Sequence, residues 1–176
     1  KGFLERNKNQ LVARIMEPDN RRQTDGLERP RHFFTVEKYE PASLWQFSLE
    51  EAEFNAGRKF LLANGTAVWS IEASVYVFQK SLRSGNQAVM LNNLVDLLHY
   101  LSDLHQPFHC IADWDGIRAG KPGLHRGYEL DIVEPMIEIM RVSGSPALIP
   151  IGELRPTLVE WARTSATQAQ AITDCI

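Results

Sequence analysis

Cysteine is scarce in this sequence. Only Cys110 and Cys175 occur among 176 residues, too few for the disulfide framework that stabilises many small secreted domains. We expect Cys110 to be a buried free thiol. The neighbouring His109 leaves metal coordination by Cys110 open, and one bridge to Cys175 also stays open.

Long hydrophobic runs and an excess of charge are lacking too. No apolar stretch approaches the roughly 20 residues that a membrane-spanning helix needs, and no signal peptide is visible. The net charge is -3 and the sequence pI is about 6.0, so there is no broad basic field for duplex nucleic acid. We therefore expect no double-stranded DNA partner, and any polyanionic substrate must be held by a metal and a few local cations.

Signals for β-structure are missing as well. The chain contains no pair of alternating strands around a hairpin turn, no internal repeat and no low-complexity segment. Apolar residues instead recur at helical spacing, in residues 3–16, 48–64, 66–82, 125–140 and 156–172 and in the segment around His99 that ends before Pro107. Residues 17–41 have no lasting period and are expected to form an ordered connection, in which most of the arginines at positions 21, 22, 29 and 31 would be solvated. Ser48 with Glu51 three positions on predicts a capping box at the start of a helix, Ser84–Asn86 predict a turn, and residues 143–150 a second connection. The prediction is an all-α fold of five or six helices in one domain, residues 1–176, with 44% hydrophobic residues to fill its core.

Residues 92–129 hold four of the five histidines. His99 and Asp103 are four residues apart, which places both side chains on one face of a helix. His125 and Glu129 repeat this spacing, and His109 follows the helix break at Pro107. One such pair is more often a hydrogen bond than a pair of metal ligands. Several ionisable groups on an apolar face, however, need a compensating cation, and imidazole with carboxylate suits Zn²⁺ better than Ca²⁺ or Mg²⁺.

Three segments together resemble a known superfamily. HYLSDLHQPFH, followed after a Gly-rich loop by LHRGYE, resembles the signature shared by bacterial zinc-dependent phospholipase C and the fungal single-strand-specific zinc nucleases. PDNRR and RPRHFFTVEKY resemble the upstream part of that pattern, and GTAVWSI resembles a segment between them. The likeness spans roughly residues 10–135, and the combined spacing is far more specific than any single pair.

The resemblance implies a cluster of three zinc ions. One zinc would be held by Asp19, His32, His99 and Asp103, with Asp103 bridging to another, and a second by His109, His125 and Glu129. Asp19 is preferred to Asp25 because its offset from His32 is closer to that of the family. The third zinc of the family uses an N-terminal Trp and a nearby His, whereas this chain begins with Lys1 and has no His before His32. We expect that an N-terminal piece is missing, with a two-zinc member as the alternative.

The resemblance also implies hydrolysis of a phosphodiester by metal-activated water. Asp19 would accept the proton of the water, and Arg22 matches an arginine that contacts phosphate in the nucleases. Glu129, where the nucleases have Asp, is similar to the phospholipase branch. A phospholipid headgroup, with peripheral membrane contact, and a single-stranded nucleic acid both stay open as substrates. The candidate substrate-binding residues are Phe33, Trp114 and Tyr128, with Phe34 beside them, and each would serve equally well in packing.

A different class of function stays open. The chain would then be a non-catalytic helical domain in which zinc, or hydrogen-bonded His and Asp pairs, only stabilises the fold. Structural zinc sites are normally closed four-ligand cages rich in Cys, whereas His109, His125 and Glu129 supply three ligands and leave a position open, which favours catalysis.

His105 matches no ligand and is assigned a supporting part. The family is exported, so we expect a periplasmic or secreted protein, and a monomer.

Overall fold

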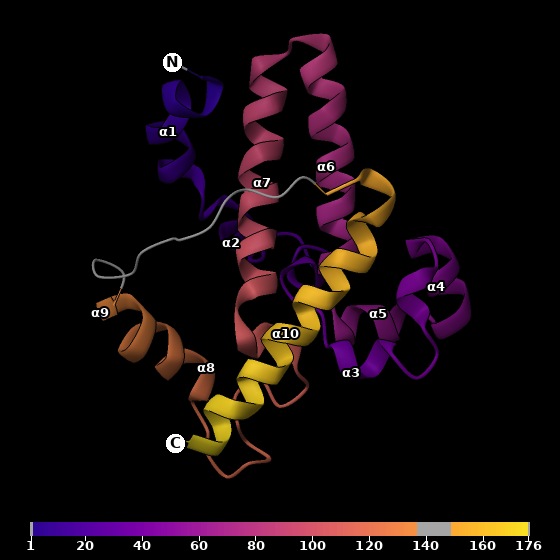
Figure 1. Cartoon of the computed structure of the whole chain (residues 1–176), viewed down its shortest axis with the longest axis vertical. Coiled ribbons are helices and arrows are strands. Elements are labelled where there is room, and N and C mark those ends of the chain that lie inside the picture. Colours follow the sequence, from indigo (N-terminus) through magenta and orange to yellow (C-terminus); the bar gives the residue numbers. More distant parts are fainter. Residues whose placement is uncertain (1, 137–148, 176) are drawn as a thin grey trace.

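The fold is helical throughout the part of the chain that the computed structural model describes, residues 2–136 and 149–175 (Figure 1). No strand occurs in these residues, which confirms the predicted all-α class. None of their helices is long and apolar enough to cross a membrane.

Two long neighbouring helices, α6 (Ala67–Ser84) and α7 (Gln87–His105), form the centre of the molecule (Figure 1). The turn between them uses Gly85 in the left-handed region (φ 69°), and the Asn86 side chain then caps α7 by accepting a hydrogen bond from the Val89 amide. This is the turn that the sequence predicted. The final helix, α10 (Leu154–Cys175), crosses both and also contacts the segment after α7.

The N-terminal segments lead onto α7. Helix α1 (Phe3–Arg14) packs against α7 through a small apolar cluster that includes Leu11 and Val95. The predicted connection, residues 17–41, contains three short helices: α2 (Glu17–Arg21), the 3-10 helix η1 (Arg29–His32) and α3 (Val36–Tyr39). Their brevity explains why no helical period was visible. Two of them, α2 and η1, have a Pro at their second position, where its fixed φ suits a helix.

Residues 48–64 are two helices rather than the single one predicted. The chain breaks at Gly57, whose φ of 86° ends α4 (Leu49–Ala56) before α5 (Arg58–Asn64) begins. The predicted capping box at the start of α4 is confirmed, because Ser48 and Glu51 each accept from the other's backbone amide. A 3-10 turn, η2 (Leu44–Gln46), precedes α4.

A close backbone approach holds η1 against the start of α6. Gly65 has φ 88°, and a Cβ atom there would lie 2.0 Å from the carbonyl oxygen of Phe33. The Tyr39 hydroxyl donates to the Gly65 carbonyl, and the Ala67 amide donates to the Phe33 carbonyl at 3.2 Å. Only glycine fits this position, and the contact fixes the residue that follows His32.

The chain after α7 is less regular than predicted. Pro107 ends α7 as expected, and the 3-10 helix η3 (Pro107–Cys110) follows. The segment expected to be one helix to about Met140 comprises α8 (Leu124–Gly127), the π-helical segment η4 (Tyr128–Val133) and α9 (Glu134–Met136). The rest of that prediction, and most of the expected connection at 143–150, lies outside the described residues. A 3-10 turn, η5 (Ile151–Glu153), leads into α10, which starts two residues before the predicted Pro156.

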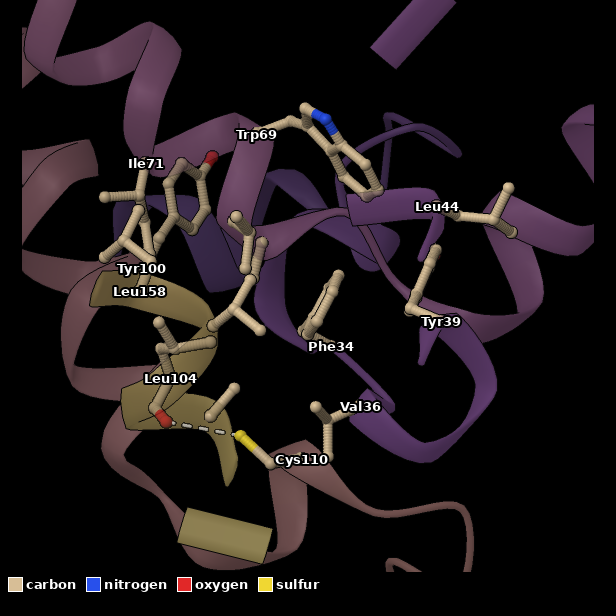
Figure 2. Close-up of a cluster of buried hydrophobic side chains, with 14 of the residues drawn as sticks. Phe34, Val36, Tyr39, Leu44, Trp69, Ile71, Tyr100, Leu104, Cys110 and Leu158 are labelled. Atoms are coloured by element: carbon tan, nitrogen blue, oxygen red, sulfur yellow. Dashed lines mark hydrogen bonds between the residues drawn. The ribbon is translucent and has the colours of Figure 1, made fainter. Parts of the chain in front are cut away.

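The largest core cluster shows which aromatic residues are packing (Figure 2). Phe34 is fully buried and stacks on Tyr39, so it cannot meet a substrate. Cys110 is buried in the same cluster and its thiol donates to the Leu104 carbonyl at 3.2 Å. Burial raises the pKa of this thiol to about 12. Cys110 and Cys175 are both free, so Cys110 is the predicted buried thiol and the bridge to Cys175 is not formed.

Candidate metal centre

Three segments far apart in sequence bring the first group of donors together. Asp19 comes from α2, His32 ends η1 and His99 lies in α7, and their ligand atoms all lie within 4.8 Å of one another. His99 Nε2 is 3.1 Å from His32 Nδ1 and 3.8 Å from an Asp19 carboxylate oxygen. Both histidines are buried. The preference for Asp19 over Asp25 agrees with this geometry, because Asp25 instead accepts a hydrogen bond from the Leu27 amide.

Asp103 joins this group and links it to the next. One carboxylate oxygen, Oδ2, lies 2.9 Å from His32 Nδ1 and 3.3 Å from His99 Nε2. The other oxygen, Oδ1, lies 3.3 Å from His109 Nδ1. That last contact is a close approach without hydrogen-bond alignment, since His109 Nδ1 has no hydrogen-bond partner. Asp103 therefore stands between the two sets of donors.

The second group forms after the break in α7. His109 Nε2 lies 2.9 Å from His125 Nε2, and Glu129 Oε1 lies 3.1 Å from His125 Nε2 and 3.9 Å from His109 Nε2. Glu129 sits in the π-helical segment, a geometry that is frequent at functional sites. The Gln106 side chain donates to Glu129 Oε1 at 2.9 Å and also accepts from the His109 amide, so it fixes two members of this group.

Neighbouring groups select which nitrogen each buried histidine offers. His99 Nδ1 donates to the Ile15 carbonyl at 2.7 Å, which leaves the Nε2 lone pair facing the other donors. His32 offers Nδ1 instead, because its Nε2 is buried 3.6 Å from a carboxylate oxygen of Glu28. A ligand histidine that gives its other N–H to a carbonyl or carboxylate is the usual arrangement around a protein-bound metal.

Glu28 is fully buried and belongs to a polar network behind His32. It accepts hydrogen bonds from Tyr100, from Arg21 at 3.2 Å and from Arg31 at 3.0 Å, and Arg21 also contacts Asp96 at 2.8 Å. Burial would raise the pKa of Glu28, but these hydrogen bonds lower it below its usual value. Arg21 and Arg31 are therefore part of this network, whereas a solvated charged loop was expected for most of the four arginines.

The surroundings hold the donor carboxylates in their charged form. Burial would raise the pKa of Asp103, yet contacts with His109, His32 and His99 outweigh it and hold that pKa well below its usual range. Burial would lower the pKa of His99, but Asp103 and Asp19 raise it overall. The hydrogen bond from His125 lowers the pKa of Glu129. The carboxylates are thus ready to bind a cation, which must displace protons only from histidine.

The donor set fits zinc. Ligands about 2.0–2.2 Å from a tetrahedral Zn²⁺ are separated from one another by about 3.3–3.6 Å, and the donor separations here run from 2.9 to 3.9 Å. Imidazole nitrogens with carboxylate oxygens, and no thiolate, are typical of catalytic rather than structural zinc sites. Two buried ring nitrogens, His32 Nε2 and His109 Nδ1, make no hydrogen bond in the described residues, and each lies near a carboxylate, Glu28 at 3.6 Å and Asp103 at 3.3 Å.

A pocket of about 460 Å³ opens beside both groups. Its walls include the ligand candidates His32, His109 and His125 together with the predicted substrate residues Phe33 and Trp114. Arg22 also lines it and contacts Asp19 at 2.7 Å. The other cationic side chains of the pocket are Arg29, Lys38 and Arg118.

The remaining candidates lie elsewhere. Tyr128 packs edge-on against Phe108 in a small apolar cluster and is not part of the pocket wall. His105 bonds through Nδ1 to the Leu101 carbonyl and contacts the Trp161 ring, so it is structural. Sequence reasoning missed Gln106, Glu28 and the pocket cations. Only Gln106 had a local signal, its position before Pro107, where polar residues cap the next turn.

Comparisons of the chain with family models, with curated proteins and with solved structures give no match.

Proposed function

We propose that this chain is a zinc-dependent hydrolase of phosphodiester bonds, with a phospholipid or a single-stranded nucleic acid as substrate. The proposal rests on how residues from distant parts of the sequence come together in the fold. Seven donors that are scattered from residue 19 to residue 129 gather into two adjoining groups beside a pocket with cationic walls. Polar pairs that only stabilised a helical domain would not need to lie at the edge of a pocket, as these donors do.

Zinc, when bound, would polarise the phosphoryl oxygens and make water acidic enough to attack phosphorus near neutral pH. The chain's own residues then have separate tasks. Arg22 presents a planar fork that suits a phosphoryl group. Asp19, whose carboxylate Arg22 contacts at 2.7 Å, is only partly buried and is placed to accept a proton from the attacking water.

The second group supports catalysis rather than a purely structural site. His109, His125 and Glu129 supply three donors, and both histidines lie in the pocket wall. The side chains of His125 and Glu129 are 24% and 43% exposed. A three-donor site with solvent access keeps a position for substrate or water, whereas a structural zinc site is closed.

The test combines metal content with turnover. We expect protein purified without added zinc to carry two or three zinc ions per chain, and zinc-loaded protein to hydrolyse bis(4-nitrophenyl) phosphate. Intact mass, read on the same sample, defines the N-terminus and shows whether the third-zinc ligands exist. A zinc-supplemented sample with no bound metal would overturn the proposal.

The competing function is a helical domain stabilised by structural zinc or by His and carboxylate pairs. One observation favours it: the donors also contact each other directly, as His32 and Asp103 do at 2.9 Å. It would be supported if chelation unfolded the chain while the zinc-loaded protein turned over no phosphodiester. Turnover that is lost on chelation and recovered with zinc would exclude it.

We also propose, on the family resemblance alone, that the protein is extracytoplasmic and monomeric. Cell fractionation and light scattering of the purified protein test these two points.

A further inference from the structure

Three cations in the pocket wall have no partner in the part of the chain that the structure describes. The side chains of Arg29, Lys38 and Arg118 make no ion pair and no hydrogen bond there, although all three line the pocket. They come from η1, α3 and the segment between η3 and α8. Three separate segments therefore direct unpaired positive charge into one cavity.

Several arginines outside this set of three are paired with acidic residues. Arg14 contacts Glu17, Arg21 contacts Glu28 and Asp96, and Arg31 contacts Glu28. Arg155 and Arg163 in α10 likewise pair with acidic residues. On a chain with net charge -3, carboxylates are not scarce, so unpaired cations gathered in a pocket mark a place where an anion binds.

Among residues 2–136 and 149–175, no Asp or Glu lines the pocket to offset these charges. Two divalent ions at the adjoining groups would also more than balance the carboxylates of Asp19, Asp103 and Glu129. A zwitterionic headgroup such as phosphocholine would then bring its quaternary ammonium into a positive field. Phe33 and Trp114 could face such a cation, but the wall also carries Arg22, Arg29, Lys38 and Arg118, whose positive charges would repel it. The charge pattern thus favours a substrate with more than one anionic group.

Two aromatic side chains in the wall indicate what lies between those anionic groups. Trp114 is 48% exposed and contacts the His125 ring edge-on, and Phe33 lines the same cavity. Exposed aromatic faces beside a cationic groove are typical of proteins that bind single-stranded nucleic acid, because bases stack on the rings while cations follow the phosphates. The cavity volume of about 460 Å³ lies within the usual range of ligand sites, about 300–1,000 Å³.

We propose that Arg29, Lys38 and Arg118 form a subsite for a second phosphate, next to the phosphodiester that is cleaved, and that the substrate is therefore a single-stranded oligonucleotide. This inference rests on the proposed function, since the reacting phosphate must lie at the two donor groups.

The first experiment compares two dinucleotides that differ by one phosphate. We expect zinc-loaded protein to cleave 5′-phosphorylated thymidine dinucleotide with a lower KM than the unphosphorylated dinucleotide. One contact between a phosphate and a cationic side chain typically strengthens binding by about tenfold. In the Lys38→Met and Arg118→Met variants, the ratio of the KM of the unphosphorylated dinucleotide to that of the phosphorylated one should fall about tenfold. If the variant with both substitutions kept the KM ratio of the unchanged protein, the proposed subsite would be wrong.

Lys80→Met is the matched control, because Lys80 is an exposed cation on α6 that does not line the pocket. It removes the same charge and should leave the ratio between the two dinucleotides unchanged. If Lys80→Met lowered that ratio as much as Lys38→Met does, the effect would come from net charge and the subsite would be wrong.

A binding measurement separates this inference from the proposed function. Fluorescence anisotropy with a phosphorothioate-linked octathymidylate should show a salt dependence that decreases by about 0.7 in log-log slope for each cation removed. If no phosphodiester is hydrolysed but this pattern holds, the proposed function fails and the anion subsite stands. If the oligonucleotide does not bind, while phosphatidylcholine vesicles containing phosphatidylglycerol bind through Lys38 and Arg118, the oligonucleotide proposal fails in favour of an anionic membrane.

Discussion

The two donor groups differ in how they are built. The first draws Asp19, His32 and His99 from segments up to 80 residues apart, and its histidine side chains are only 3% and 7% exposed. The second draws His125 and Glu129 from one helical stretch, and its members border solvent. A metal in the first group would connect α2, η1 and α7, whereas one in the second would mainly face the pocket. The first group is thus better placed to stabilise the fold, and the second to meet substrate.

Asp103 belongs to both sides of this comparison, so its replacement should have the largest effect. Asp103→Asn removes a charge that contacts His32, His99 and His109. Breaking a buried charged contact costs about 3–5 kcal/mol, and we expect phosphodiesterase activity to fall by at least about a hundredfold. The measurement is kcat/KM with zinc content determined on the same sample. Asp174→Asn at the exposed C-terminal end of α10 is the control. Full activity in Asp103→Asn would contradict the proposed function.

Replacing one histidine in each group tests whether the first group stabilises the fold more than the second does. His99→Ala should lower the free energy of unfolding of the zinc-loaded protein by about 2–4 kcal/mol, since it leaves a cavity and breaks a link between segments. His125→Ala should cost about 1 kcal/mol because the residue is partly exposed. Urea unfolding with excess zinc measures both. Equal losses would show that the groups do not differ in their structural role.

The buried network behind His32 should tune the first group alone. In Glu28→Gln the charge that faces His32 Nε2 is lost, and changes in such outer contacts typically reduce metal affinity by about 10–100-fold. Cobalt substitution, followed through its visible absorption, reports the two sites separately. Asp96→Asn is the matched control because it perturbs the same network through Arg21 without touching His32. A loss of equal size in both variants would indicate general destabilisation rather than positioning of His32.

The smallest expected effect is on pH dependence. The pKa of Asp103 is lowered in the folded state, so its contribution to stability is present above about pH 4 and is lost as the pH falls through the folded value. The pKa of His99 is raised, so its contribution is present below about pH 6.5 and is lost as the pH rises through the folded value. Zinc needs His99 deprotonated.

Zinc should therefore raise the Tm more at pH 8 than at pH 5.5. Scanning calorimetry of zinc-free and zinc-loaded protein at both pH values measures this difference. An increment that stays constant over this range would show that His99 does not compete with zinc for a proton.

Much of the regular structure could be predicted from the sequence because its causes are local. The capping box at Ser48, the turn at Gly85 and the helix stop at Pro107 depend on residues within a few positions of each other. The short helices within residues 17–41 could not be predicted, because a helix of four or five residues carries too little periodicity. The break at Gly57 was missed for a related reason. One glycine is tolerated within many helices, and only the neighbouring packing decides whether it bends the chain.

The all-α class, and the helix faces that carry His99 with Asp103 and His125 with Glu129, could be read from the amino-acid sequence. They follow from spacing along a helix and from side-chain chemistry. The meeting of Asp19 and His32 with His99, the burial of Glu28 behind His32, and the shared pocket of Arg29, Lys38 and Arg118 became visible only in the folded chain. These contacts join residues that are far apart in the sequence. Contacts between segments tens of residues apart depend on how whole helices pack, and no local pattern encodes that packing.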